Sequence, residues 1–121
     1  MATVKVCEDK NLIENSAAMG EILKKRLHEM KEKHPSIGDV RSIGLFAAIE
    51  LVKDRQTREP LAFWNGPDPG FIGQISGCLK EKGVYVYPRW NYLFLAPPIA
   101  INEAELKIGL DVVDSCLDLA D

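Results

Sequence analysis

The feature that most restricts the fold is the run Val40 to Val52, VRSIGLFAAIELV, which is rich in β-branched and aliphatic residues. Such residues favour extended backbone, so the run predicts a strand, bent where Gly44 interrupts it. Between Leu45 and Ile49 both faces of that strand are largely apolar. A strand with two apolar faces must be covered, so we expect it to be central in a sheet that is packed against helices.

A helical pattern precedes this run, between Asn11 and Pro35. Apolar residues recur there at three- and four-residue steps and form one stripe, made of Ile13, Ala17, Gly20, Leu23, Leu27 and Met30. Asn11 is placed to cap the helix, with Glu14 three residues on to return the hydrogen bond. Pro35 ends the pattern, and the charged residues lie away from the apolar stripe. We therefore expect an amphipathic helix that packs on the sheet.

Two more helices follow the run. Phe71 to Lys82 predicts a second helix, with Gly83 where a left-handed C-terminal residue is needed. Asn102 and Glu105 repeat the capping pattern at the start of a last helix. The apolar positions of that helix point to one side, and they are Leu106, Leu110, Val113 and Leu117. Both segments thus offer a face to the same core.

Two short strands, Val84 to Tyr87 and Tyr92 to Leu95, are predicted between these helices, joined by the turn Pro88 to Asn91. The order is helix, strand, helix, strand, strand, helix. The expected fold is a two-layer α/β sandwich, in which a small, mostly antiparallel sheet is covered on one face by about three helices. With 121 residues, the chain is expected to form a single domain over residues 1–121.

Composition excludes several classes of protein. The net charge of −3 leaves no excess of Lys and Arg for holding nucleic acid. The apolar stretch Leu93 to Ile101 is far shorter than the ~20 residues of a spanning helix, and Met1 to Glu8 is an irregular tail without the apolar block of a secretory signal. Three widely spaced cysteines, Cys7, Cys78 and Cys116, are interpreted as reduced, mostly buried thiols. We therefore expect a cytoplasmic protein with no membrane contact.

No catalytic residue or metal site is predicted from the residues alone. Neither phosphate-binding glycine motif, GxGxxG or GxxxxGK[ST], occurs, and His28 and His34 are expected to be solvated. A Schiff-base lysine needs a desolvated pocket, whereas the lysines here lie among charges, at helix ends or in the amino-terminal tail. The chain therefore shows no nucleophile, base or metal-ligand motif.

The turn Tyr87 to Tyr92, YPRWNY, is the one suggestive segment. The planar guanidinium of Arg89 matches a carboxylate, and the neighbouring aromatic rings could exclude water from that pair. Two interpretations stay open: an exposed arginine on an aromatic hairpin turn, or an anion clamp at the mouth of a site. Trp64, in the loop WNGPDPG, is expected to cover either an interface or a local gap.

Two blocks of sequence carry a family resemblance. They are HPSIGDVRSIGLFAAIELVKDRQTREP and GVYVYPRWNYLFLAPPIAINEAELKIGLDVVD. In order and spacing they resemble the carboxyl-terminal part of class-III aminotransferases, the pyridoxal phosphate (PLP) enzymes that include the 4-aminobutyrate, ornithine and ω-amino acid types. The resemblance extends from Ala2 to the last helix. Within the family, Arg89 to Pro98 looks most like the pyruvate-dependent ω-amino acid or taurine types.

The resemblance implies the small C-terminal domain of a fold-type I enzyme, without its large PLP-binding domain. The parent enzyme would transfer an amino group from an amine or ω-amino acid to a 2-oxo acid, using PLP and a dimer mate. The family's Schiff-base lysine lies in the large domain, so this chain alone is expected to bind no PLP and to be inactive. The alternative is a free-standing, non-catalytic α/β ligand-binding or regulatory domain.

The chain departs from the family at one position. Several members have an arginine shortly before the proline pair, where it meets a substrate carboxylate, whereas Phe94 and Leu95 stand here. Our hypothesis makes Arg89 the carboxylate clamp, with Trp90 and Asn91 shaping the entrance; Arg41 is a weaker candidate. We also expect self-association through exposed apolar surface, which lies around Phe46, Trp64, Trp90, Phe94 and Pro97-Pro98.

Overall fold

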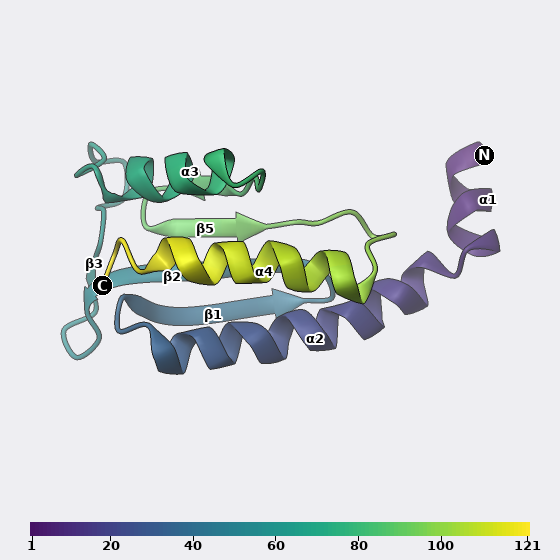
Figure 1. Ribbon diagram of the computed structural model, residues 1–121, viewed down its shortest axis with the longest axis horizontal. Helices are drawn as coiled ribbons and strands as arrows, with labels where there is room; N and C mark the ends of the chain where they lie inside the picture. Colours follow the sequence, from purple (N-terminus) through teal and green to yellow (C-terminus); the bar gives the residue numbers. More distant parts are fainter.

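A computed structural model describes residues 1–121 as one sheet with helices on one side of it (Figure 1). The helices are α1 (Ala2–Asp9), α2 (Leu12–Lys33), α3 (Phe71–Glu81) and α4 (Glu103–Leu117). The strands are β1 (Ile37–Ile43), β2 (Phe46–Asp54), β3 (Glu59–Pro60), β4 (Tyr87–Arg89) and β5 (Tyr92–Leu95). The sheet order is β1-β2-β5-β4, every pairing is antiparallel, and β3 pairs with β2.

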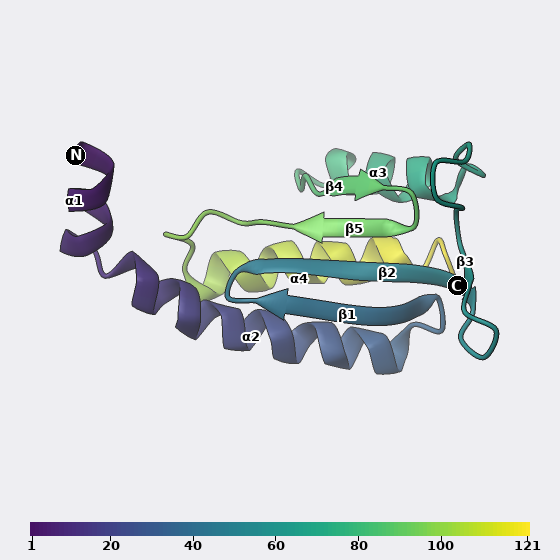
Figure 2. The same ribbon diagram turned by 180° about the vertical axis from the view of Figure 1, so that it is seen from behind.

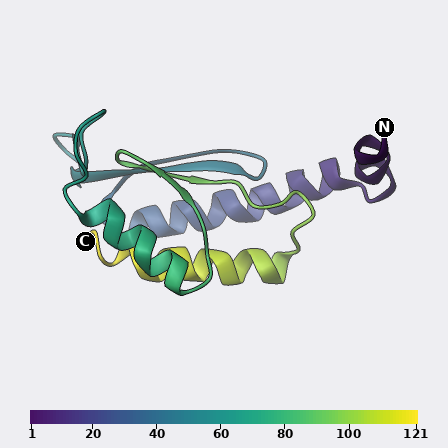
Figure 3. The same ribbon diagram turned by 90° about the horizontal axis from the view of Figure 1, so that it is seen from above.

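Two layers make up the body of the molecule. Helices α2, α3 and α4 lie against one face of the sheet, whereas no helix covers the other face (Figures 1 and 2). Seen from above, the sheet forms one layer and these three helices form the other (Figure 3). The two-layer α/β fold with a small antiparallel sheet is therefore confirmed. No helix has both the length and the apolar character needed to cross a membrane.

The predicted strand Val40 to Val52 is two strands. Its centre is a two-residue turn, Gly44-Leu45, with Ile43 paired to Phe46 on either side. Gly44 has a φ of +52°, which glycine adopts readily, and a positive φ at the first loop residue is the pattern of the type II′ hairpin turn. The expectation of one bent strand was wrong because the glycine reverses the chain instead of bending it.

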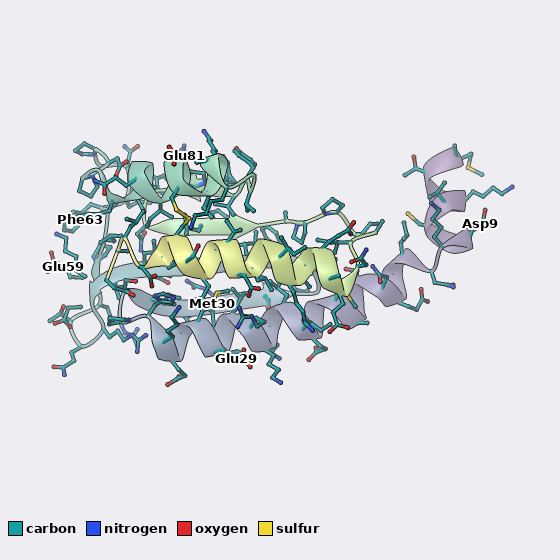
Figure 4. All side chains as sticks on the ribbon, in the orientation of Figure 1. Asp9, Glu29, Met30, Glu59, Phe63 and Glu81 are labelled. Carbon is teal, nitrogen blue, oxygen red and sulfur yellow. A yellow bond between two sulfur atoms is a disulfide. The ribbon has the colours of Figure 1, made fainter.

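Alternation along the strands places the core. Ala47, Ile49 and Leu51 of β2 are buried against the helices, as are Leu93 and Leu95 of β5. From the other layer the core receives buried side chains of α2 and α4, which are Leu23, Leu27, Met30, Leu106, Leu110, Val113 and Leu117. On α2, Glu29 lies on the outer side and Met30 toward the interior (Figure 4).

A close approach of backbones fixes α2 against the β1–β2 hairpin. A Cβ atom at Gly20 would lie 2.7 Å from both the Cα and the carbonyl carbon of Gly44. A glycine inside a helix costs about 1 kcal/mol relative to alanine. Here its lack of a side chain is what allows helix and turn to touch.

The amino terminus differs from the expectation of an irregular tail. Residues Ala2–Asp9 form helix α1, which buries no residue and projects beyond the sheet (Figure 1). Asn11 then turns the chain into α2 with a φ of +48° and makes no capping bond. The predicted cap was wrong, because a capping residue needs extended backbone. Ile13, placed on the core stripe by the sequence, is 76% exposed in the first turn of α2.

The ends of α3 and α4 agree with the sequence. The Val84 amide donates to the Leu79 carbonyl and the Gly83 amide to the Lys80 carbonyl, the Schellman pattern with Gly83 at φ +79°. The Asn102–Glu105 capping box is complete, with bonds of 2.9 and 3.1 Å. The strand predicted from Val84 begins only at Tyr87.

The segment after β5 is held by a side chain of α2. Asn15 Nδ2 donates to the carbonyl oxygens of Ile99 and Ile101, at 2.8 and 3.0 Å. Pro97 and Pro98 have no N–H, so they cannot continue the strand ladder. The chain between β5 and α4 is thus fastened to α2 instead of to a neighbouring strand.

Two of the three cysteines are joined. A disulfide links Cys78 of α3 to Cys116 of α4, with a Cα–Cα distance of 5.9 Å, and appears as a yellow bond between these helices in Figure 4. The expectation of reduced thiols was wrong for this pair, because two helices far apart in sequence bring the cysteines together; Cys7 is free. The cysteines therefore no longer support the expected cytoplasmic location.

Candidate functional site

The β4–β5 hairpin carries the predicted site residues Arg89, Trp90 and Asn91. Its loop is only the two residues Trp90-Asn91, because Arg89 pairs with Tyr92 across the ladder. Trp90 has a φ of +51°, a conformation that costs a non-glycine residue about 1–2 kcal/mol. The surroundings of the turn must supply that energy.

Aromatic and cationic contacts surround Trp90. The guanidinium carbon of Arg89 lies 4.6 Å from the centre of the Trp90 ring. The Trp64 ring, from the loop before α3, has its centre 5.5 Å from the centre of the Trp90 ring. Such contacts contribute about 0.5–1.5 kcal/mol each. Trp64 is itself 75% exposed, and it covers Trp90 locally. The structure thus brings Arg89 and Trp90 into direct contact.

Asn91 has a different setting. Its side chain is buried, and Nδ2 donates to the Leu51 carbonyl oxygen at 3.1 Å. The Leu51 amide in turn donates to the Asn91 carbonyl oxygen at 2.7 Å. These two bonds fix the turn to the end of β2. The geometry therefore gives Asn91 a positioning role, whereas Arg89 remains exposed to solvent.

The uncovered face of the sheet carries four aromatic rings, which we name the aromatic face: Phe46, Tyr87, Tyr92 and Phe94. Phe94 is the centre of this group, with ring distances of 6.2 Å to Phe46, 6.2 Å to Tyr87 and 5.9 Å to Tyr92. Contact with the other three rings leaves Phe94 half-buried, whereas Phe46 stays exposed. A hollow of about 440 Å³ opens here, lined in part by Phe46, Tyr92 and Phe94.

Arginines stand on both sides of Tyr92. Arg89 pairs with Tyr92 from β4, and the guanidinium carbon of Arg41 lies 5.6 Å from the centre of the Tyr92 ring. Arg41 is also an ion-pair residue, bonded to Glu50 and 3.6 Å from Asp39. Arg41 therefore has its charge balanced within the chain, while Arg89 has no acidic partner within ion-pair distance. Of the two candidates, Arg89 is the one free to meet a carboxylate.

His34 departs most from the sequence analysis. It is completely buried, although we expected a solvated side chain; His28 is exposed as expected. Nε2 lies 2.6 Å from Asp114 Oδ1, and Nδ1 lies 2.6 Å from Asp121 Oδ2. Each ring nitrogen of His34 thus has a carboxylate oxygen as its hydrogen-bond partner. The signal in the sequence is a helix-like spacing of three acids, Asp114, Asp118 and Asp121, which places them on the same side of the chain at the end of α4.

The two carboxylates that hold His34 titrate at low pH. Burial tends to raise the pKa of Asp114, but hydrogen bonds from Lys33 and His34 outweigh it and hold the pKa below its ordinary value. For Asp121, hydrogen bonds from Ser36 and His34 likewise lower the pKa against the opposing effect of burial. This network, which we name the His34 latch (His34, Asp114, Asp121 and Ser36), ties the residues after α4 to the start of β1.

The lysines do not fit a covalent cofactor site. Nine of the ten lysines are exposed, and the half-buried one, Lys31, is bonded to Asp39 at 3.1 Å. A lysine that reacts with an aldehyde near neutral pH needs a desolvated environment that lowers its pKa. None of the nine exposed lysines therefore has the desolvated environment that such a reaction needs.

Comparison with known proteins identifies the family. The family model for Aminotransferase class-III matches residues 1–117. An ethanolamine-phosphate phospho-lyase homolog of Caenorhabditis elegans is 37% identical over 98% of this chain and 25% of its own length. The 4-aminobutyrate aminotransferase of Escherichia coli is 33% identical over 99% of this chain and 27% of its own length. The chain thus spans about a quarter of the length of these relatives.

Solved structures give the same picture. The taurine:2-oxoglutarate aminotransferase of Bifidobacterium kashiwanohense, determined with PLP and glutamate, superposes with a TM-score of 0.90 at 31% identity, covering 95% of this chain and 26% of that one. A PLP-bound amine transaminase from an uncultivated Pseudomonas species also gives 0.90, at 28% identity over 99% of this chain and 26% of its own. Sequence and fold agree, and the chain belongs to the class-III aminotransferases.

Proposed function

We propose that residues 1–121 act as the C-terminal small domain of a PLP-dependent transaminase, which transfers an amino group from an amine or ω-amino acid to a 2-oxo acid. The observation that carries the proposal is the family match over nearly all of this chain and about a quarter of its relatives. The reactive lysine and the bulk of the PLP site then belong to a large domain, and this chain alone is inactive. The same proposal places the enzyme in the cytoplasm, although a disulfide such as Cys78–Cys116 is more common in oxidising compartments.

In that enzyme, Arg89 binds a substrate carboxylate. Its guanidinium is exposed, unpaired with any acid, and oriented by contact with Trp90. Trp90, supported by Trp64, limits access of water at the entrance, and Asn91 holds the turn on β2. The chain contributes binding and orientation, while PLP supplies the electron sink for the chemistry when bound. No proton-transfer step is assigned to a residue of this chain.

A chimera tests the proposal directly. Residues 1–121 replace the matching last quarter of the taurine–pyruvate aminotransferase of Bilophila wadsworthia, which is 37% identical over 92% of this chain. We expect PLP absorbance and measurable amino transfer to a 2-oxo acid. A folded chimera that binds PLP without turnover would contradict the proposal and favour a non-catalytic module. For the isolated chain, borohydride trapping of a pyridoxyl adduct at one lysine, together with amino-group exchange, would also contradict the proposal, because it would show activity without a large domain.

Arg89→Ala in the chimera tests the clamp. Loss of a charge-assisted carboxylate pair costs about 2–3 kcal/mol, so kcat/KM for carboxylate substrates should fall about 30- to 150-fold. Amines without a carboxylate should be unaffected as donors. Lys24→Ala, which removes one exposed charge from α2, is the control. Unchanged kcat/KM for every carboxylate substrate would remove Arg89 from the site.

The aromatic face is proposed to be covered by the large domain or the dimer mate. Phe46 and Tyr87 are more than half exposed on the uncovered side of the sheet. Apolar patches of this kind promote association, so the isolated chain should form concentration-dependent oligomers. Sedimentation velocity at rising concentration measures this. A strict monomer that binds no apolar dye would contradict it.

A further inference from the structure

A polar hollow of about 370 Å³ opens at the β1 edge of the sheet, apart from the β4–β5 turn. It lies between the last turns of α2, the start of β1 and the loop after β2. Four basic residues, Lys31, Arg41, Arg55 and Arg58, and two acidic residues, Asp39 and Glu50, line it. The hollow is thus positively charged within a chain whose net charge is −3.

Each acid in the hollow is already paired. Lys31 Nζ lies 3.1 Å from Asp39 Oδ1, and Arg41 is bonded to Glu50. Burial tends to raise the pKa of Asp39, but the hydrogen bond from Lys31 and the charges of Lys31 and Arg41 hold it below its ordinary value. Both acids are therefore already paired within the chain. Two guanidinium groups, those of Arg55 and Arg58, remain without a carboxylate partner.

Arg55 is held rigidly without losing its charge. Nε donates to the Ile37 carbonyl oxygen at 2.9 Å, and Nη2 donates to the carbonyl oxygens of Lys31 and His34. These acceptors carry no full charge, so they orient the guanidinium without forming an ion pair, and the carbonyls of Lys31 and His34 add only the partial negative charge of the C-terminal end of α2. The two N–H groups of Nη1 remain available.

Arg58 projects from an ordered turn. The Asp54 carboxylate accepts the amides of Gln56 and Thr57, at 2.6 and 2.9 Å, and thereby fixes the loop. Arg58 follows with a φ of +59° and lines the same hollow as Arg55. The side chain of Arg58 is exposed, so an incoming ligand can reach it.

From this geometry we infer that the hollow binds a small dianionic oxyanion, namely a phosphate group. Planar guanidinium forks match the oxygens of phosphate, and two uncompensated positive charges balance its two negative charges. An apolar ligand finds no matching wall, and a cation would meet the unbalanced arginines. None of its residues belongs to the β4–β5 turn, although Arg41 also contacts Tyr92 on the aromatic face.

Titration of the 121-residue chain with inorganic phosphate at constant ionic strength tests the inference. Calorimetry should show one saturable site, and two-dimensional amide spectra should place the largest shifts at Gly38 and near Arg58. Arg58→Asn keeps a residue that tolerates positive φ but removes the charge, so binding should weaken by about ten-fold or more. Lys24→Asn, which changes the net charge equally on an exposed part of α2, should leave the affinity unchanged.

Methyl phosphate in a parallel titration separates two sources of the group. Equal affinity for methyl phosphate indicates a phosphoester ligand, and binding of inorganic phosphate alone indicates the free ion. Absence of saturable binding to both probes would overturn the inference. So would equal weakening by Arg58→Asn and Lys24→Asn, because it would show only general charge attraction. An unchanged melting temperature without phosphate confirms that both variants are folded.

Discussion

The two hairpins of the sheet solve the same geometric problem with different residues. Each has a two-residue loop whose first member has a φ near +50°, Gly44 in one and Trp90 in the other. Glycine takes this conformation without strain, whereas tryptophan pays about 1–2 kcal/mol. The glycine turn packs against Gly20 and is structural. The tryptophan turn retains a strained backbone and a half-buried ring beside Arg89, and strain of this kind at a non-glycine residue motivates the binding role that we propose for the turn.

Support for the two hairpins also differs. The Gly44 turn is supported by backbone contact with Gly20 of α2 and by the buried Leu45, while the Trp90 turn is supported by the bonds of Asn91 to β2 and by the Trp64 ring. If this contrast is correct, perturbing one hairpin should leave the other in place. Five measurements test it.

Reduction of the disulfide should have the largest effect. Cys78 and Cys116 are separated by 38 residues, and freeing a loop of that length costs about 4 kcal/mol of unfolding free energy by chain entropy. Because α3 leads directly into β4, amide exchange should rise more around Tyr87 than around Gly44. Urea unfolding with and without reductant measures the loss, and Cys7→Ser serves as the control. An unchanged midpoint after complete reduction would show that the link adds nothing.

Acid should weaken the end of the sheet near the Trp90 turn. The pKa values of Asp114 and Asp121 are lower in the folded chain than the ordinary 3.8, so their contribution is complete above that value. It is lost as the pH falls through the folded pKa, because the unfolded chain binds the protons first. Amide exchange at Ser36 should rise before exchange at Gly44.

A substitution in the His34 latch checks the same point. Asp114→Asn removes charge-assisted bonds to Lys33 and His34 and should cost about 2 kcal/mol at neutral pH, with a flatter acid dependence. Asp111→Asn, on the exposed side of α4, should cost at most about 1 kcal/mol. Equal losses would mean that the latch is no stronger than a surface ion pair.

Gly20→Ala should break the support of the Gly44 turn. Its Cβ would collide with the Gly44 backbone, and overpacking of this kind costs about 1–3 kcal/mol, reduced by about 1 kcal/mol of gained helix propensity. Gly109→Ala in α4 meets open space and should instead stabilise the chain by about 1 kcal/mol. Opposite signs in urea unfolding are expected. Stabilisation by both substitutions would show that α2 and the turn are not in contact.

Adding backbone strain at Gly44, or removing it at Trp90, should have the smallest effect on the free energy of unfolding. Gly44→Ala adds about 1–2 kcal/mol of strain, and its Cβ would lie 3.2 Å from Ser16 Oγ. Trp90→Gly relieves a similar strain but loses the contacts with Trp64 and Arg89, so its net change should be within about 1 kcal/mol of zero. Comparable destabilisation by the two variants would refute the distinction between the hairpins.

Features that depend on neighbouring residues could be predicted from sequence patterns. The capping box at Asn102 and the C-terminal glycine at Gly83 are confirmed, because each depends on residues only a few positions apart. The two-layer fold followed from apolar periodicity in the same way. Asn11 matched the capping pattern equally well but was wrong, since the preceding helix α1 dictates its backbone conformation. A capping motif therefore predicts a helix start only where the preceding segment allows the capping residue an extended backbone.

Features that depend on distant residues were missed. The burial of His34 requires acids some 80 residues further on, and the disulfide requires α3 and α4 to meet. The basic hollow likewise combines α2, β1 and the loop after β2. Of the candidate site, the contact between Arg89 and Trp90 could be predicted because the two residues are adjacent in sequence. The buried bonds of Asn91 to Leu51 could not.

The fastening of the β5–α4 segment by Asn15 has a chemical consequence. One amide nitrogen serves two carbonyl oxygens, so hydrolysis of that amide to a carboxylate would replace two donated protons by a negative charge facing two acceptors. Asn15→Asp makes the same change by substitution. A change at this one group would then detach the connection between the sheet and the last helix from α2.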